Sequence, residues 1–339
     1  MADTQRSGDL TESDDGLTAE GVPRKRRRRA LRITLLTLAS VTVLLGAAAA
    51  GTFVYINDIV GSIPRIPVKF LVESSPSHGM TILLTDADDG SAAVNSVKRT
   101  AARSGMILLL HIDAGNKAAG VVSIPAGTVV NVPGHGKMRI EDVDAIGGPS
   151  LLVETVHDLT GVPINHFARI DFVHVAVLVD ALGGVSIRLP SASESFGHLF
   201  RAGVNQVGGI EALEYTGDPA LTEAGRVLRQ QYLTRVILDK VGSAHMLINP
   251  LKANGVLHAL VSMLTVDSNF SNAQVESLAT QLGSLAGPAS TFITAPTQVT
   301  NGSEVLEPAQ SAALWSAVKD GRIAAFAENY PSSVTPTAP

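Results

Sequence analysis

A cluster of six basic residues, Arg24 to Arg29, leads almost directly into an uncharged apolar stretch at residues 33–56. As a helix, a run of roughly 20 or more apolar residues is long enough to span the hydrocarbon core of a bilayer. Short flanks rich in Lys and Arg stay on the cytoplasmic side. This junction therefore predicts a single-pass protein of the plasma membrane, with a cytoplasmic N-terminus and an extracytoplasmic C-terminal domain.

Other interpretations of the apolar stretch fit less well. A cleavable signal peptide has an apolar core of about 7–15 residues, although the small residues at 47–51 leave cleavage open. A buried core helix would not normally follow six charges. A nucleic-acid role for the basic cluster does not suit its place beside a membrane span, whereas contact with anionic lipid head groups does.

These features predict five segments along the chain. They are a disordered basic cytoplasmic tail (1–29), a transmembrane helix (30–57), a tether or first edge strand (58–79), an extracytoplasmic domain (80–330) and a disordered tail (331–339).

The composition of the chain limits the classes of partner that the predicted extracytoplasmic domain can bind. Of the 26 Lys and Arg and the 31 Asp and Glu in the chain, eight basic and six acidic residues lie in the first 32 positions. The rest is therefore net acidic, which argues against a nucleic-acid partner or any general binding of polyanions. Cysteine is absent, whereas an exported eukaryotic domain of this size would often carry disulfides. A bacterial domain with a large core can do without them.

Hydrophobic periodicity predicts a layered α/β or α+β domain. Short apolar runs indicate strands, and the period of 3.6 residues indicates helices. Strands that alternate with helices favour such a layered arrangement. The predicted strands are 81–85, 106–112, 120–124, 166–172 and 185–189, and the predicted helices are 149–160, 173–182, 223–241, 272–285 and 308–319, with Ser271 as the N-cap of the fourth.

Familiar enzyme motifs are missing, but one helix carries a suggestive set of polar residues. The chain contains no P-loop, no G-x-S-x-G turn and no His-Glu-x-x-His helix. On the predicted helix 223–241, however, Arg226, Arg229 and Gln230 share one face. Two guanidinium groups and an amide suit a di-anion such as pyrophosphate. The alternative is a solvated helix whose arginines pair with Glu223 or Asp239.

Several short stretches, taken in order, resemble the LytR-CpsA-Psr family of bacterial envelope proteins from about residue 81 to 325. The stretches are RS at 103–104, LLLHID at 108–113, SIP at 123–125, VPGHGK at 132–137, GGP at 147–149, LTGV at 159–162, IDF at 170–172, LVDALGGV at 178–185, GR at 225–226 and RQQ at 229–231.

The resemblance implies a function and a fold. Members of this family transfer glycopolymers from polyprenyl-pyrophosphate carriers to peptidoglycan with the help of Mg²⁺. The fold expected is a central mixed β-sheet flanked by helices, with a hydrophobic groove for the lipid, preceded by one transmembrane helix. The resemblance further implies that Arg103 and Arg226 are catalytic, that Arg103, Lys137, Arg226, Arg229 and Gln230 bind pyrophosphate, and that Asp88 binds the metal.

The sequence also departs from the family pattern at several charged positions. Gly90 and Gly105 stand where the pattern has an arginine and a metal-linked aspartate. Ala126 and Gly127 replace an arginine and an aspartate, and Gly217 and Pro219 replace two further arginines. Because a charge-assisted hydrogen bond contributes about 1.5–3 kcal/mol, these losses predict a depleted active site. Two hypotheses follow, a weakened phosphotransferase of the glycopolymer–peptidoglycan ligase type, or an inactive paralogue that binds lipid or glycan or acts as a scaffold.

Overall fold

The computed structural model describes residues 51–52, 54–74, 79–86, 106–114, 118–242, 250–285 and 290–334. The chain divides into two compact units, Met1–Tyr55 and Ile56–Pro339. Of the predicted span 30–57, only residues 51–52 and 54–57 are described, and they are helical. No helix in the described part of the chain has both the length and the apolar character needed to cross a membrane. The predicted tails at 1–29 and, beyond Val334, at 335–339 also lie outside the described residues.

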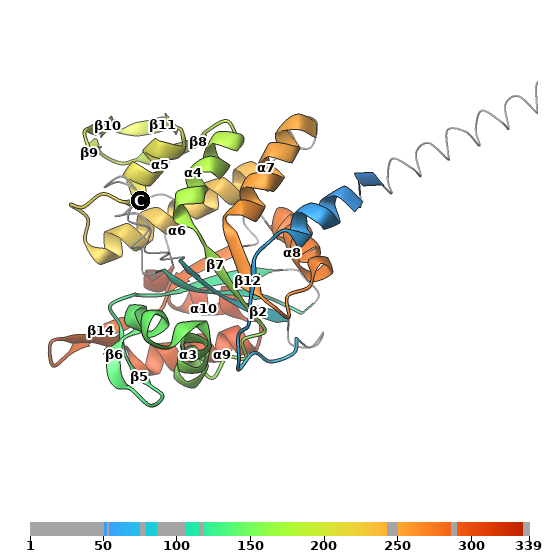
Figure 1. Cartoon of the computed structure of the whole chain (residues 1–339). Helices are drawn as coiled ribbons and strands as arrows, with labels where there is room; N and C mark the ends of the chain where they lie inside the picture. The colour runs from blue at the N-terminus through green and yellow to red at the C-terminus, as the bar shows by residue number, and fades with distance from the viewer. Residues whose placement is uncertain are drawn as a thin grey trace, which may run out of the picture. The chain divides into compact units, whose positions relative to one another are not determined.

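The second unit is built on a seven-stranded mixed sheet (Figure 1). Its order is β1 (Arg65–Ile66), β12 (Leu264–Asp267), β7 (His166–Ile170), β2 (Met80–Asp86), β3 (Ile107–Ile112), β4 (Ala119–Ile124) and β13 (Ser290–Thr294). The pairs β1–β12, β2–β7 and β4–β13 are parallel, and the other three pairs are antiparallel. The central mixed sheet expected from the resemblance is confirmed. Residues 65–66 form an edge strand, which was one of the two alternatives for this region.

Helices cover both faces of this sheet, and each face has its own hydrophobic core (Figure 1). One face carries α4 (Phe172–Ala181), α5 (Gly209–Thr216), α6 (Glu223–Gly242), α7 (Pro250–Ser262) and α8 (Asn272–Leu285). The other carries α3 (Val143–Thr160), α9 (Pro308–Lys319) and α10 (Ile323–Asn329). Alternation along β3 explains the division, because Leu108 and Leu110 belong to the first core and Ile107 and Leu109 to the second.

Four two-stranded ribbons and two short 3₁₀ helices complete the described fold. The ribbons are β5 (Val129–Val132) with β6 (Gly136–Arg139), β8 (Val185–Leu189) with β11 (Gly203–Val207), β9 (Ser193–Ser195) with β10 (His198–Phe200), and β14 (Thr297–Thr300) with β15 (Ser303–Leu306); the 3₁₀ helices are η1 (Ile140–Asp142) and η2 (Pro331–Ser333).

The strands and helices predicted between residues 81 and 319 are all present, with informative differences at their ends. The helix predicted at 149–160 extends back to Val143, with a break at Gly148, whose φ of 70° is left-handed. The predicted cap at Ser271 is confirmed, because its Oγ accepts a hydrogen bond from the Gln274 backbone N–H at 3.3 Å. Gln274 Oε1 in turn accepts from the Ser271 backbone N–H at 3.0 Å, which completes a capping box.

Burial of His111 makes the stability of this unit sensitive to acid. His111 lies within β3, is 3% exposed, and its Nδ1 lies 2.9 Å from Thr81 Oγ1. Burial lowers the pKa of His111 from 6.5 to about 4. His111 therefore binds a proton near pH 6.5 in the unfolded chain but only near pH 4 in the folded chain. The stability of the folded state falls as the pH drops through that window.

We expect the unfolding free energy to fall by about 1–2 kcal/mol between pH 7 and 5. Urea unfolding of the full chain can be followed through its single tryptophan, the buried Trp315. His111→Gln should flatten this dependence. Burial raises the pKa of the neighbouring Asp113, which acts in the opposite direction, so the comparison with the variant isolates His111. An equally steep dependence in the variant would contradict the assignment.

Candidate functional site

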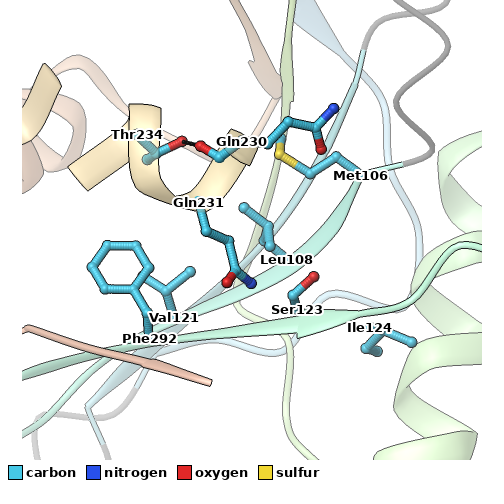
Figure 2. A pocket seen from close by; sticks show the side chains of 9 residues that line it. All are labelled: Met106, Leu108, Val121, Ser123, Ile124, Gln230, Gln231, Thr234 and Phe292. Carbon is cyan, nitrogen blue, oxygen red and sulfur yellow. Dashed lines mark hydrogen bonds between the residues drawn. The ribbon is translucent and has the colours of Figure 1, made fainter. Parts of the chain in front are cut away.

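Gln230, one of the three residues predicted on helix α6, lies where this helix packs against the sheet. Gln230 and Gln231 are both 4% exposed and line a cavity that Met106, Leu108, Val121 and Phe292 bound from the sheet side. Figure 2 shows Gln231 reaching from the helix toward the strands beside Leu108 and Ser123, and Gln230 lying beside Met106. The cavity is therefore apolar at its base and has amide groups on the helix side.

This cavity is small in the described structure. Its volume is about 10 Å³, which is close to the roughly 10–15 Å³ that admits one water molecule. Gln230 Nε2 is buried and makes no hydrogen bond with any described residue. Because an unsatisfied buried amide costs about 1–3 kcal/mol, this position favours a polar guest. A lipid chain would fit only after α6 moves away from the sheet, so the predicted lipid-binding groove stays a prediction.

Arg229 points away from this cavity and holds α6 to the preceding elements. Its Nη1 donates to the Tyr215 carbonyl at 2.9 Å and to Asp218 Oδ2 at 3.3 Å, and its Nη2 donates to Ser193 Oγ at 3.1 Å. The guanidinium also lies 4.8 Å from the centre of the Tyr215 ring, within the range of a cation–π contact. The alternative prediction paired the arginines of this helix with Glu223 or Asp239, whereas the structure pairs Arg229 with Asp218.

The structure does not gather all the predicted site residues into one place. Arg226 lies one helical turn before Arg229 and is half-buried. Lys137 is exposed on the β5–β6 ribbon, whose apolar residues belong to the core on the opposite face of the sheet from α6. Asp88 and Arg103 lie outside the described residues, between the end of β2 and the start of β3. These two predicted roles therefore stay predictions.

One replaced position, Gly127, lies close to charged side chains from elsewhere in the chain. A Cβ placed on Gly127 would lie 3.2 Å from Glu304 Oε2 and 3.7 Å from Arg139 Nη2. Glu304 comes from β15 and accepts a hydrogen bond from Thr297 Oγ1 at 2.7 Å, and Arg139 contacts Glu141. Sequence reasoning missed Glu304 because it lies 177 positions along the chain from Gly127.

A metal site is not visible among the described residues. No group of three or more His, Cys, Asp or Glu side chains in that part of the chain is arranged to hold an ion. The predicted ligand Asp88 lies outside it. A carboxylate is the hard oxygen donor that Mg²⁺ prefers, so the residue type suits the metal that the resemblance implies.

Comparisons with known proteins agree with the resemblance inferred from the sequence. The LytR_cpsA_psr family model matches residues 64–315. The cell wall biosynthesis protein LcpA of Corynebacterium glutamicum is 29% identical over 227 residues, which cover 58% of this chain and 43% of LcpA. The chain thus spans less than half the length of that relative.

A second relative supports the same grouping, and a solved structure shares the fold. The polyisoprenyl-teichoic acid–peptidoglycan teichoic acid transferase TagU of Bacillus subtilis is 25% identical over 230 residues, covering 64% of this chain and 72% of TagU. The structure of a LytR-Csp2A-Psr enzyme from Actinomyces oris matches with a TM-score of 0.59 and 21% identity, covering 76% of this chain and 96% of that one. At this identity the structural match shows the fold alone.

Proposed function

The chain belongs to the LytR_cpsA_psr family, and on that premise we propose that it transfers a glycopolymer from a polyprenyl-pyrophosphate carrier to peptidoglycan during cell wall assembly. The observation that carries the proposal is the family match over residues 64–315, and the apolar space between α6 and the sheet, lined by Gln230 and Gln231, is where the carrier would enter. In this proposal the span at 30–57 anchors the domain at the membrane, where the carrier lipid resides. Confinement to that surface raises the effective concentration of donor.

The chemistry asked of the protein is mainly positioning and charge stabilisation. In phosphoryl transfer the attacking and leaving oxygens lie roughly in line, and negative charge spreads over the phosphoryl oxygens. Arg103 and Arg226 would contact those oxygens, and Asp88 would hold Mg²⁺. When bound, the metal would neutralise part of the pyrophosphate charge. Gln230 faces the cavity and would add an amide contact, whereas Arg229 is held by Asp218 and is the weaker candidate.

Opening of the cavity is a required part of this proposal. A lipid chain needs far more room than the space now present, so α6 must separate from β3 and β4 when the carrier binds. The buried amide of Gln230, without a hydrogen-bond partner among the described residues, would find one in the polar pyrophosphate end of the carrier rather than in its lipid chain. Such a pocket, closed in the free protein and opened by its ligand, corresponds to selection of a minor conformation.

Replacing Arg226 tests the proposal directly. If Arg226 makes one charge-assisted contact to the transferred group, Arg226→Met should lower donor turnover by about 10- to 150-fold, equivalent to 1.5–3 kcal/mol. The measurement is turnover of a polyprenyl-pyrophosphate-linked glycopolymer by the purified full chain. Arg322→Met is the matched control, because Arg322 is an exposed arginine on the other side of the sheet, paired with Asp320. Equal turnover by the unaltered chain, Arg226→Met and Arg322→Met would contradict the proposal.

A second candidate is an inactive paralogue that binds lipid or glycan. The Arg229–Asp218 contact favours it, because an acidic partner occupies a guanidinium that would otherwise face pyrophosphate. The glycines and alanine at positions where the family pattern has arginines favour it as well. This candidate predicts donor binding without turnover in the same assay.

A further inference from the structure

A second cavity lies at the edge of the sheet where the parallel strands β2 and β7 end. Its volume is about 170 Å³, roughly tenfold more than the 10–15 Å³ that one water needs. Thr85 and Asp86 of β2 and Arg169 of β7 line it, and Thr85 and Arg169 are paired in the sheet. Ligands of open α/β sheets bind beyond the carboxyl ends of the strands, so this edge is a favourable place for a site.

The floor of this second cavity is apolar and its walls are polar. Ile107, Ile140 and Leu152, all nearly fully buried, form the floor. Glu141 and Asp144 stand on the wall beside Asp86 and Arg169. The cavity therefore combines an apolar surface with hydrogen-bond acceptors and a guanidinium donor.

Arg169 is held in place without using its full donor capacity. A single nitrogen, Nη2, donates to Asp144 Oδ1 at 2.7 Å and to Asp144 Oδ2 at 2.6 Å. Its Nε is buried and makes no hydrogen bond with a described residue. Because a guanidinium carries five N–H donors, Arg169 can still donate to a guest while Asp144 fixes its position.

The charges of the second cavity select the class of guest. Three carboxylates line the cavity, against Arg169 on Asp144 and Arg139 on Glu141, so the balance stays negative and a phosphate or another anion would meet net repulsion. A sugar is neutral, its hydroxyl groups both donate and accept, and the C–H face of its ring packs on apolar side chains. Carboxylates satisfy the hydroxyl donors, and Arg169 supplies a donor to a hydroxyl or amide oxygen.

We propose that this cavity, lined by Asp86, Glu141, Asp144 and Arg169, binds one sugar unit of the acceptor glycan. This inference rests on the proposed function, which supplies the acceptor. The two cavities lie on opposite faces of the sheet at the start of β3. Ile107 lines the sugar cavity, whereas its neighbours Met106 and Leu108 line the cavity under α6. Donor and acceptor would thus approach the same edge of the sheet from opposite faces.

Binding of a soluble peptidoglycan glycan fragment to the purified full chain tests this site. Arg169→Met removes the donor, and Ala145→Trp fills the cavity while both Arg169 and Asp144 are kept, since Ala145 is an exposed residue that lines the cavity. Both variants should weaken binding at least tenfold by calorimetry. Ala324→Trp, an exposed alanine of α10 elsewhere on the domain, should bind like the unaltered chain. Circular dichroism identifies any variant that fails to fold.

The possible outcomes distinguish failure of the sugar site from failure of the proposed transferase function. If the unaltered chain does not bind the fragment, or if Ala145→Trp binds it unchanged, the sugar site is overturned. Donor turnover into water, measured in parallel, reports on the cavity under α6. Loss of glycan binding in Ala145→Trp together with no donor turnover in any protein would uphold the sugar site and overturn the transferase.

Discussion

Replacing Arg229 by methionine is expected to lower the free energy of unfolding by about 3–5 kcal/mol. The side chain of Arg229 is 12% exposed and that of its partner Asp218 is 5% exposed. Without the guanidinium, Asp218 becomes a buried carboxylate with no opposite charge, and the Tyr215 carbonyl and Ser193 hydroxyl each lose a donor. Methionine keeps much of the apolar volume, so the loss reports on the charge and its hydrogen bonds.

The fluorescence of Trp315 during urea unfolding measures this effect in the full chain. Arg322→Met is again the control, because its pair with Asp320 is solvent-exposed, with side chains 66% and 45% exposed, and such pairs contribute about 0–1 kcal/mol. The double variant Arg229→Met/Asp218→Leu should recover part of the loss, since it removes the isolated carboxylate. A loss below about 1 kcal/mol in Arg229→Met would show that the pair does not fix α6 to α5.

The second large effect is expected at Asp267, the fully buried carboxylate at the end of β12. Its Oδ2 accepts from the Phe167 backbone N–H at 3.0 Å and faces His166 Nδ1 at 3.1 Å, while its Oδ1 accepts from the Asn269 backbone N–H at 2.8 Å. Because Nδ1 faces a carboxylate, it is the nitrogen that carries the proton, and Nε2 then accepts from Gln274 Nε2 at 3.2 Å.

Asp267→Ala leaves several buried donors without an acceptor. At about 1–3 kcal/mol for each unsatisfied group, we expect a loss of about 3–5 kcal/mol in unfolding free energy. The same urea titration measures it. Asp158→Ala is the matched control, because Asp158 also contacts a histidine, His157 at 3.4 Å, but on the surface. That control should change stability by about 0.5 kcal/mol or less. Equal effects of the two variants would contradict the buried network.

The strongly periodic parts of the fold were predictable from the sequence. The apolar run of β3 and the spacing of Leu228, Tyr232 and Val236 on α6 each carry enough local signal to identify an element. Strand β12 was not predicted, because its four residues are too short to show a clear alternation. The β5–β6 ribbon was missed as well, since β6 reads Gly-Lys-Met-Arg and is mostly exposed.

The sequence shows which residue types share a face of α6 but not which contacts they make. Helical spacing placed Arg226, Arg229 and Gln230 near one another, yet it could not show that Asp218, brought close by the turn after α5, would pair with Arg229. The sugar cavity gave no local signal, because Asp86 and Arg169 meet only when β2 and β7 pair across more than 80 residues. Contacts of this kind follow from topology rather than from local pattern.

The proposed transfer can be measured most directly with a labelled polyprenyl-pyrophosphate-linked glycopolymer, insoluble peptidoglycan and Mg²⁺. The purified full chain should move label into the peptidoglycan, and Arg226→Met should reduce that incorporation by about 10- to 150-fold. Bacillus subtilis TagU, the transferase to which this chain is 25% identical over 230 residues, serves as the positive control. The proposed transferase activity would be contradicted if TagU incorporated label while this chain incorporated no more than its Arg226→Met variant. That result would identify an inactive paralogue.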